Sequence, residues 1–124
     1  MHRSINILDT TAGTTTTEPV SIEGARVVSV WATATIATGN TGLIRVQTSA
    51  DGSYWADYNK LIDNVTNTNS QQLTRISAIS FAASSNGVKF ASLSPEDTFR
   101  YLRITAGGNA HIIVYVEIED EQHI

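Results

Sequence analysis

The chain has 124 residues, enough for one domain with its own core, and it contains no cysteine, so neither disulfides nor thiolate metal sites hold it together. Its formal net charge of −4 and its eight scattered Lys and Arg residues argue against a nucleic-acid partner, because phosphate binding needs clustered basic side chains. No apolar run is long enough for a membrane-spanning helix, and Met1–Asp9 lacks the apolar segment of a secretory signal. We therefore expect a soluble protein made in a cytoplasm, with no membrane partner.

Three regions are expected along the chain. Residues 1–19 are predicted to be an extended N-terminal arm or an edge segment, in which Ile5–Asp9 can add a short strand and Thr10–Thr17 is too poor in apolar residues to pack by itself. A β-sandwich domain is predicted over residues 20–118. Residues 119–124 are an acidic C-terminal tail.

The first long strand is predicted over Val28–Ile36, where apolar and polar residues alternate with a period of two. Trp31 falls in the polar register, among serine and threonine, so we expect it on the outer face of the strand. Residues 43–49 alternate in the same way after a Gly-rich turn. This pattern predicts a hairpin between the two strands.

An Asp51-Gly52 turn follows, and it is expected to return the chain through a strand that begins near Tyr54 and Trp55. This unit of a strand, a turn and a return strand is predicted to be partnered by a second strand near the C-terminus, which contains Phe99–Ile104. Between them, Leu73–Phe81 reads as a strand that is apolar on both sides, with Ile76 on one face and Ile79 and Phe81 on the other. Such a strand needs cover on both faces, from the domain or from a neighbouring subunit.

The last predicted elements are Val88–Leu93, entered through an Asn-Gly turn, and a hairpin formed by Phe99–Ala106 and Ala110–Ile118. About eight strands result, at intervals of roughly 8–12 residues. No helix is predicted. The expected fold is therefore all-β, an antiparallel β-sandwich or jelly roll.

The sequence offers little for catalysis. A Ser-His-Asp arrangement needs a histidine beside both partners, and the chain has only His2, His111 and His123, two of which lie at the termini. No phosphate-binding loop or ordered metal-ligand spacing is present. We expect no enzyme activity, no cofactor and no metal site.

The aromatic and aliphatic side chains are the better candidates for binding. Trp31 is predicted to be an interface residue because an exposed tryptophan on a strand favours protein contact. The other candidate interface residues are Ile5, Ile7, Ile79 and Phe81. An alternative is a sugar-stacking platform made of Tyr54, Tyr58 and Tyr115.

Two segments carry a family resemblance. LIRVQTSADGSYWADY (residues 43–58) and FRYLRITAGGNAHIIVYVEI (residues 99–118) resemble the second half of galactose-binding-like, or discoidin-like, jelly rolls, where an SxDGxxW strand precedes an RYxRI strand. They look equally like small β-sandwich structural proteins of tailed bacteriophages. The segment before them, Ile22–Ile36, has neither the ligand-building segment nor the DLG strand of the carbohydrate-binding members, which favours the phage resemblance.

The resemblance implies a noncatalytic bacteriophage virion protein, most simply a capsid decoration or cement subunit that binds the major capsid protein or other virion subunits. A homo-oligomer is expected, assembled in the host cytoplasm and located in the virion. The alternatives are a head–tail or tail accessory protein, and a carbohydrate-binding module for host attachment. Fold-level likeness suggests these roles without fixing one of them.

Overall fold

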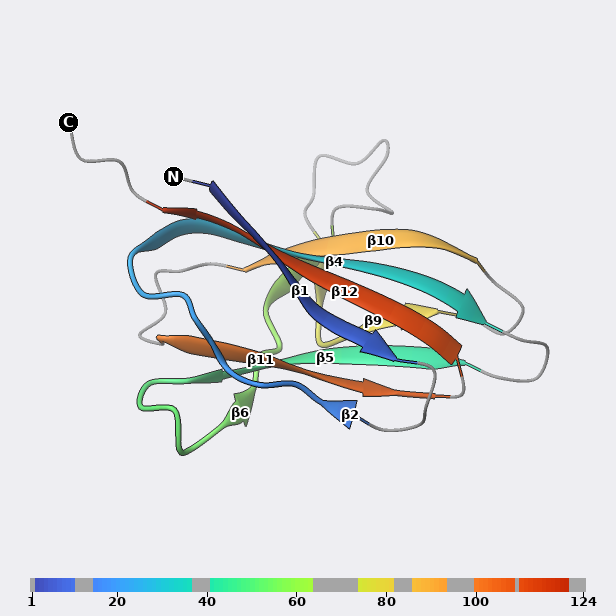
Figure 1. Ribbon diagram of the computed structural model, residues 1–124, viewed down its shortest axis with the longest axis horizontal. Coiled ribbons are helices and arrows are strands. Elements are labelled where there is room, and N and C mark those ends of the chain that lie inside the picture. Colours follow the sequence, from blue (N-terminus) through green and yellow to red (C-terminus); the bar gives the residue numbers. More distant parts are fainter. Residues whose placement is uncertain are drawn as a thin grey trace.

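The chain folds into two β-sheets packed face to face, as the computed structural model shows (Figure 1). The structure describes residues 2–10, 15–36, 41–63, 74–81, 86–93, 100–108 and 110–120, and all regular structure in these ranges is β-strand. Over these residues, no helix has the length and apolar character needed to cross a membrane. The predicted fold class, an all-β antiparallel sandwich, is confirmed.

The larger sheet has six strands in the spatial order β1-β12-β4-β10-β7-β8. Three long antiparallel strands form its centre, and its two margins differ in length: one is a long strand and the other a pair of short strands. The strands are β1 (His2–Thr10), β12 (Ala110–Asp120), β4 (Ala25–Ile36), β10 (Asn86–Leu93), β7 (Leu61–Asp63) and β8 (Thr74–Ile76).

The smaller sheet is built on one long pair, β5 and β11, with short strands on either side. β2 and β3 pair with β11, whereas β6 and β9 pair with β5. The strands are β2 (Thr15–Thr16), β3 (Val20–Ser21), β5 (Gly42–Ser49), β6 (Ala56–Asp57), β9 (Ile79–Phe81) and β11 (Tyr101–Gly107). A strand near the C-terminus was predicted to partner the unit around Asp51-Gly52; β11 is that strand, and it pairs with β5, which precedes the turn.

The core lies between the two sheets and follows the predicted alternation. On β4, the inward side chains from Val28 to Ile36 are at most 3% exposed, whereas the outward ones include Trp31. On β12, Ile112, Val114, Val116 and Ile118 are buried in the same way. From the other sheet, Ile44, Val46, Leu102 and Ile104 close the core. A period of two thus buries one face of each long strand.

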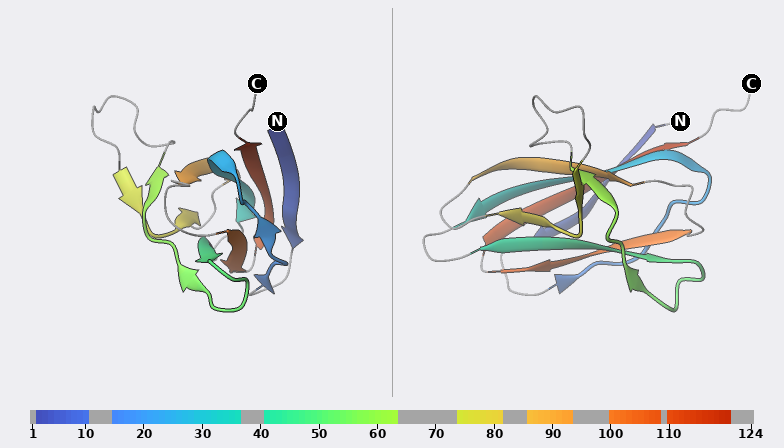
Figure 2. Two further views of the ribbon diagram at one scale, coloured as in Figure 1. Left: turned by 90° about the vertical axis from the view of Figure 1, so that its left-hand side faces the viewer. Right: turned by 180° about the vertical axis from the view of Figure 1, so that it is seen from behind.

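Both long hairpins predicted from the sequence are wrong. β4 lies in the larger sheet and the next strand, β5, in the smaller one; β11 and β12 are separated in the same way (Figures 1 and 2). Successive long strands lie in opposite sheets, so their apolar faces meet across the core. A jelly roll alternates its strands between two sheets in this manner.

The segment Leu73–Phe81, predicted as one strand apolar on both sides, is two strands in its described part. β8 belongs to the larger sheet and β9 to the smaller, and the chain bends at Ser77 and Ala78 between them. The bend turns Ile79 and Phe81 inward, where they are 2% and 3% exposed. No second subunit is needed to cover them.

The N-terminal segment lies against the sandwich. β1 pairs with β12 from His2 to Thr10, as an edge strand of the larger sheet, with a β-bulge between Asn6 and Leu8. Further along, Thr17 is buried; its N–H donates to the Ile104 carbonyl at 2.9 Å and its Oγ1 accepts from the Ile104 N–H at 3.0 Å. Residues 2–10 and 15–19 are therefore integral to the fold. The sequence had left two alternatives for this region, an extended arm or an edge segment, and residues 2–10 form an edge strand.

Candidate interaction surface

Three aromatic side chains lie in one row on the outer face of the larger sheet. Trp31 on β4 is directly opposite Phe90 on β10 and Tyr115 on β12. The rings of Trp31 and Phe90 are stacked, with centroids 4.1 Å apart and 13° between their planes. Trp31 is 37% exposed and Tyr115 is 40% exposed. We call Phe90, Trp31 and Tyr115 the aromatic row.

Most of the large exposed apolar side chains gather on this face. Among the described residues, five are both large and exposed, and four of them, Val27, Trp31, Val88 and Tyr115, lie on the outer face of the larger sheet. Val88 lies opposite Thr33, next to the row, and Val27 lies near the other end of β4. Clustered exposed apolar residues mark an interaction surface, whereas single ones are ordinary.

The stacked rings of Trp31 and Phe90, of which Trp31 is exposed, form a ridge beside an open hollow. This open depression of about 350 Å³ is lined by His2, Val27, Ser29, Glu117 and Glu119 together with Trp31. A smaller hollow of about 80 Å³ lies between β8, β9 and β10, where Phe90 and the buried Ile79 both line it, at the margin between the two sheets. The larger depression has the size of a small-ligand pocket, so it can take one aromatic side chain.

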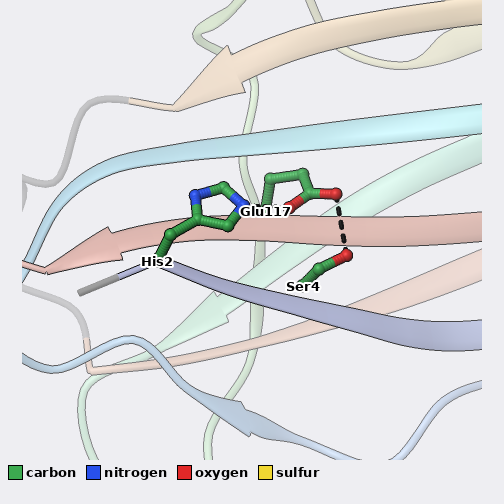
Figure 3. A network of polar contacts seen from close by, with 3 residues as sticks. All are labelled: His2, Ser4 and Glu117. Carbon is green, nitrogen blue, oxygen red and sulfur yellow. Dashed lines mark hydrogen bonds and ion pairs between the residues drawn. The ribbon is translucent and has the colours of Figure 1, made fainter.

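The charged groups beside the row are paired within the chain. His2 Nε2 lies 2.7 Å from Glu117 Oε2, and Ser4 Oγ donates to Glu117 Oε1 at 2.8 Å (Figure 3). Arg26 contacts Glu119 at 2.7 Å, and His111 Nε2 lies 2.9 Å from Asp9 Oδ1. The two histidine–carboxylate pairs join β1 to β12 near both ends of the edge strand.

The His2, Ser4 and Glu117 cluster does not have the connectivity of a hydrolase triad. In a triad the imidazole lies between the hydroxyl and the acid, so that it can take the hydroxyl proton. Here the carboxylate lies in the middle and accepts from the hydroxyl itself. Ser4 is therefore not activated by His2, and the cluster fastens an edge strand.

The second tryptophan, Trp55, lies in the connection just before β6, and its ring is covered by Arg103 of the smaller sheet. The Arg103 guanidinium carbon is 4.4 Å from the Trp55 ring centroid. Arg103 Nε donates to Gln47 Oε1 at 2.8 Å, and Gln47 Nε2 donates to Asp57 Oδ1 at 2.9 Å. This chain of contacts holds the cation over the ring, so Trp55 has its partner inside the chain.

The loop before Trp55 is organised by two side chains. Asp51 Oδ1 accepts from the N–H groups of Tyr54 and Ser53, at 3.0 and 2.9 Å, and from Ser49 Oγ at 3.0 Å. Hydrogen bonds from the Tyr54 and Ser53 backbone, then from Ser49, hold the pKa of the Asp51 carboxyl below its ordinary value. Gly52 has a φ of 83°, as its predicted place in the turn requires. The Asp-Gly turn is confirmed, within a loop longer than the two or three residues expected.

Of the five predicted interface residues, Trp31 is exposed, and Ile5 and Ile7 are half-buried and pack against the core. Ile79 and Phe81 are core residues, as described above, because β9 belongs to the smaller sheet. Their burial contradicts an interface role in the isolated chain. For Ile5 and Ile7, on edge strand β1, the interface role stays a prediction.

The structure does not bring together the three tyrosines of the predicted sugar platform. Tyr58 is 6% exposed and part of the core, and its N–H donates to the Val46 carbonyl at 2.8 Å. Tyr54, 83% exposed, is on the loop that leaves the smaller sheet, whereas Tyr115 is on the outer face of the larger sheet. Their rings therefore cannot share a ligand face.

Phe90 is the functional candidate that the sequence did not reveal. Its place in the outward register of the predicted strand Val88–Leu93 was visible, but its contact with Trp31 depends on which strands pair and in which register. Among the described residues, no three His, Cys, Asp or Glu side chains come together as a metal site would require.

The sheet edges offer little room for added strands. β1 is long, but its bulge and its charged residues disturb regular pairing. At the opposite margin of the larger sheet, β8 has three residues, and the strands beside β5 and β11 have two or three. Bulges, charges and very short edge strands are the devices that discourage edge-to-edge pairing. The outer face of the larger sheet is thus the more available surface.

The protein is a β-sandwich with an exposed aromatic row on the outer face of its larger sheet. Its described part contains no recognisable reaction centre. No family model matches the chain, and no curated protein matches its sequence. Among solved structures it is similar to the SPBc2 prophage-derived protein YomS, with a TM-score of 0.64 and 10% sequence identity. The match covers 95% of this chain and 92% of that one, so the two share a fold over most of their length.

Proposed function

We propose that the chain is a noncatalytic structural protein of a bacteriophage virion, a capsid decoration or cement subunit that binds the major capsid protein or other virion subunits. The observation that carries the proposal is the exposed aromatic row on a rigid sheet. Phe90, Trp31 and Tyr115 form a contiguous apolar strip with Val88 beside it, and aromatic residues are enriched at protein interfaces.

The layout of polar groups supports a binding role over catalysis. The carboxylates beside the row already contact histidine or arginine within the chain, and the one hydroxyl in Figure 3 donates to a carboxylate. Catalytic groups need partners arranged to move a proton toward a reacting atom. These pairs instead fix strands to one another, as a structural scaffold requires.

The likeness to a prophage-derived protein, over most of the length of both chains, supports a phage setting. A shared fold does not carry a function with it, so the likeness bears on the biological context rather than on the partner. A small subunit repeated over a symmetric shell gains avidity from many weak contacts. A decoration subunit therefore needs one adequate surface and no deep binding pocket.

The direct test is the composition of purified particles from a lysate in which the encoding phage or prophage has been induced. We expect mass spectrometry to find the chain in the virions, and antibody labelling in electron micrographs to mark the shell. Label confined to the neck or tail would favour the head–tail or tail accessory alternative. A chain present in the lysate and missing from the particles would overturn the proposal.

A further inference from the structure

We propose that the aromatic row binds a second copy of this chain, in a two-fold dimer in which Trp31 of each copy enters the depression beside Trp31 of the other. This inference rests on the proposed function, because it names the subunit that the exposed face contacts. It leaves the smaller sheet and the exposed Tyr54 loop free to contact the shell.

The shape of the face is the first argument. The Trp31 ridge lies directly beside a depression of about 350 Å³, to which Trp31 itself contributes a wall. When a ridge and a hollow are neighbours on one surface, a two-fold axis between them places each ridge in the other hollow. An isologous interface has this reciprocity, since residue i contacts j while j contacts i.

The charges on the face are the second argument. The chain carries a formal net charge of −4, so two copies repel each other wherever acidic side chains are uncompensated. At the depression, Glu117 contacts His2 and Glu119 contacts Arg26. A like-charged copy meets carboxylates there that already have partners within the chain: Arg26 pairs with Glu119, and Glu117 contacts His2 and Ser4. Neither described carboxylate of the depression is left without a partner for a strongly basic protein.

The closed edges are the third argument. Self-association through strand addition is disfavoured by the bulge in β1 and by the two- and three-residue strands at the other margins. The outer face of the larger sheet carries four of the five large exposed apolar residues found in the described part of the chain. Face-to-face contact buries them together.

Analytical ultracentrifugation of the purified chain tests the dimer. We expect the wild type to be dimeric at tens of micromolar, and Trp31→Ala to raise the dissociation constant by more than about tenfold, as for a tryptophan hot spot. Ser29→Arg fills the depression and leaves Trp31 itself unchanged, so it should also raise the dissociation constant. The new arginine faces Glu117 across the β4–β12 pair. Tyr54→Ala, on the other sheet, is the matched control and should leave the dimer unchanged.

Cross-linking tests the geometry, because the chain has no cysteine of its own. Ser29 lies at the expected axis, so Ser29→Cys should give a disulfide-linked dimer under mild oxidation. Thr35→Cys lies on the same face of β4, about 20 Å away at ~3.3 Å per residue, and should not. Circular dichroism confirms that each variant is folded.

A wild type that stays monomeric, or a dimer that survives both Trp31→Ala and Ser29→Arg, would overturn the inference. Its failure is distinguishable from failure of the proposed function. If the chain is monomeric and is found in purified virions, the dimer is contradicted and the structural role is supported. If the chain is dimeric and is absent from virions, the dimer is supported and the structural role is contradicted.

Discussion

Two tryptophans lie at the outer faces of the two sheets, and their surroundings differ. Trp55, just before β6, is covered by Arg103 of the smaller sheet, which Gln47 holds in place. Trp31 on the larger sheet stacks on Phe90 and lines an open depression that it shares with Ser29 and Val27 of the same strand. Trp55 therefore completes its contacts within the chain, whereas Trp31 presents apolar surface outward. An exposed aromatic is informative where neighbouring residues leave it uncovered.

The largest effects are expected on the inner faces, where the two sheets should be equivalent. Ile104 on β11 and Ile112 on β12 are 0% and 1% exposed. Ile104→Ala and Ile112→Ala should each lower the free energy of unfolding by about 2–5 kcal/mol, through lost burial and a residual cavity. Urea unfolding monitored by circular dichroism measures both. If only one sheet responds, the sheets differ in more than their outer faces.

Truncation of the two tryptophans should lower the stability of the monomer by different amounts. Trp55→Ala is expected to cost about 2 kcal/mol, because it removes a half-buried ring and leaves Arg103 without its aromatic partner. Trp31→Ala should cost about 1 kcal/mol, the worth of an exposed aromatic stack. Both are best measured in the Ser29→Arg background, in which association does not contribute. Equal costs would contradict the distinction drawn between the two residues.

Arg103 sharpens the comparison further. Arg103→Ala should lower stability by about 1 kcal/mol, by losing the contact with Trp55 and the hydrogen bond to Gln47. Arg103→Lys keeps the charge without the Nε–H donor, and its stability should lie between those of the wild type and Arg103→Ala. Arg45→Ala, an exposed arginine on β5 of the same sheet, is the charge-matched control, with an effect within about 0.5 kcal/mol. If thermal melts show the same loss of stability for Arg103→Ala as for this control, the Arg103 guanidinium does not stabilise the fold through Trp55.

How much of this was visible in the sequence depends on the level of structure. The alternation over Val28–Ile36 correctly assigned each side chain to the inner or outer face, including Trp31. The Asp51-Gly52 turn was also predicted, and Gly52 has the positive φ that such a turn requires. Both follow from local patterns, because a period of two and a turn dipeptide are properties of short segments.

The sequence did not show which of the two sheets each strand joins. Neighbouring strands with one apolar face each can form a hairpin or stack across a core, and the local pattern is the same for both. Trp31, Phe90 and Tyr115 come from three strands whose adjacency appears only after that choice is made. Tyr115 was consequently grouped with Tyr54 and Tyr58, residues that the fold places elsewhere. The candidate site is a product of register, which single-strand patterns do not specify.

The smallest expected effect concerns the loop that delivers Trp55. Hydrogen bonds from Tyr54, Ser53 and Ser49 lower the pKa of Asp51, so its charged form is favoured in the folded chain. A carboxyl with a lowered folded pKa contributes stability that is present above its unfolded pKa and is lost as the pH falls through the folded one. Asp51→Asn should therefore melt slightly below wild type at neutral pH, and the two melting temperatures should converge in acid. The effect is small because the carboxylate is exposed and screened by solvent. Melting curves from neutral to acidic pH, with an NMR titration of the Asp51 carboxyl in the wild type, measure it. An Asp51 that titrates at its ordinary value, with a melting difference independent of pH, would show that the loop places Trp55 without help from this charge.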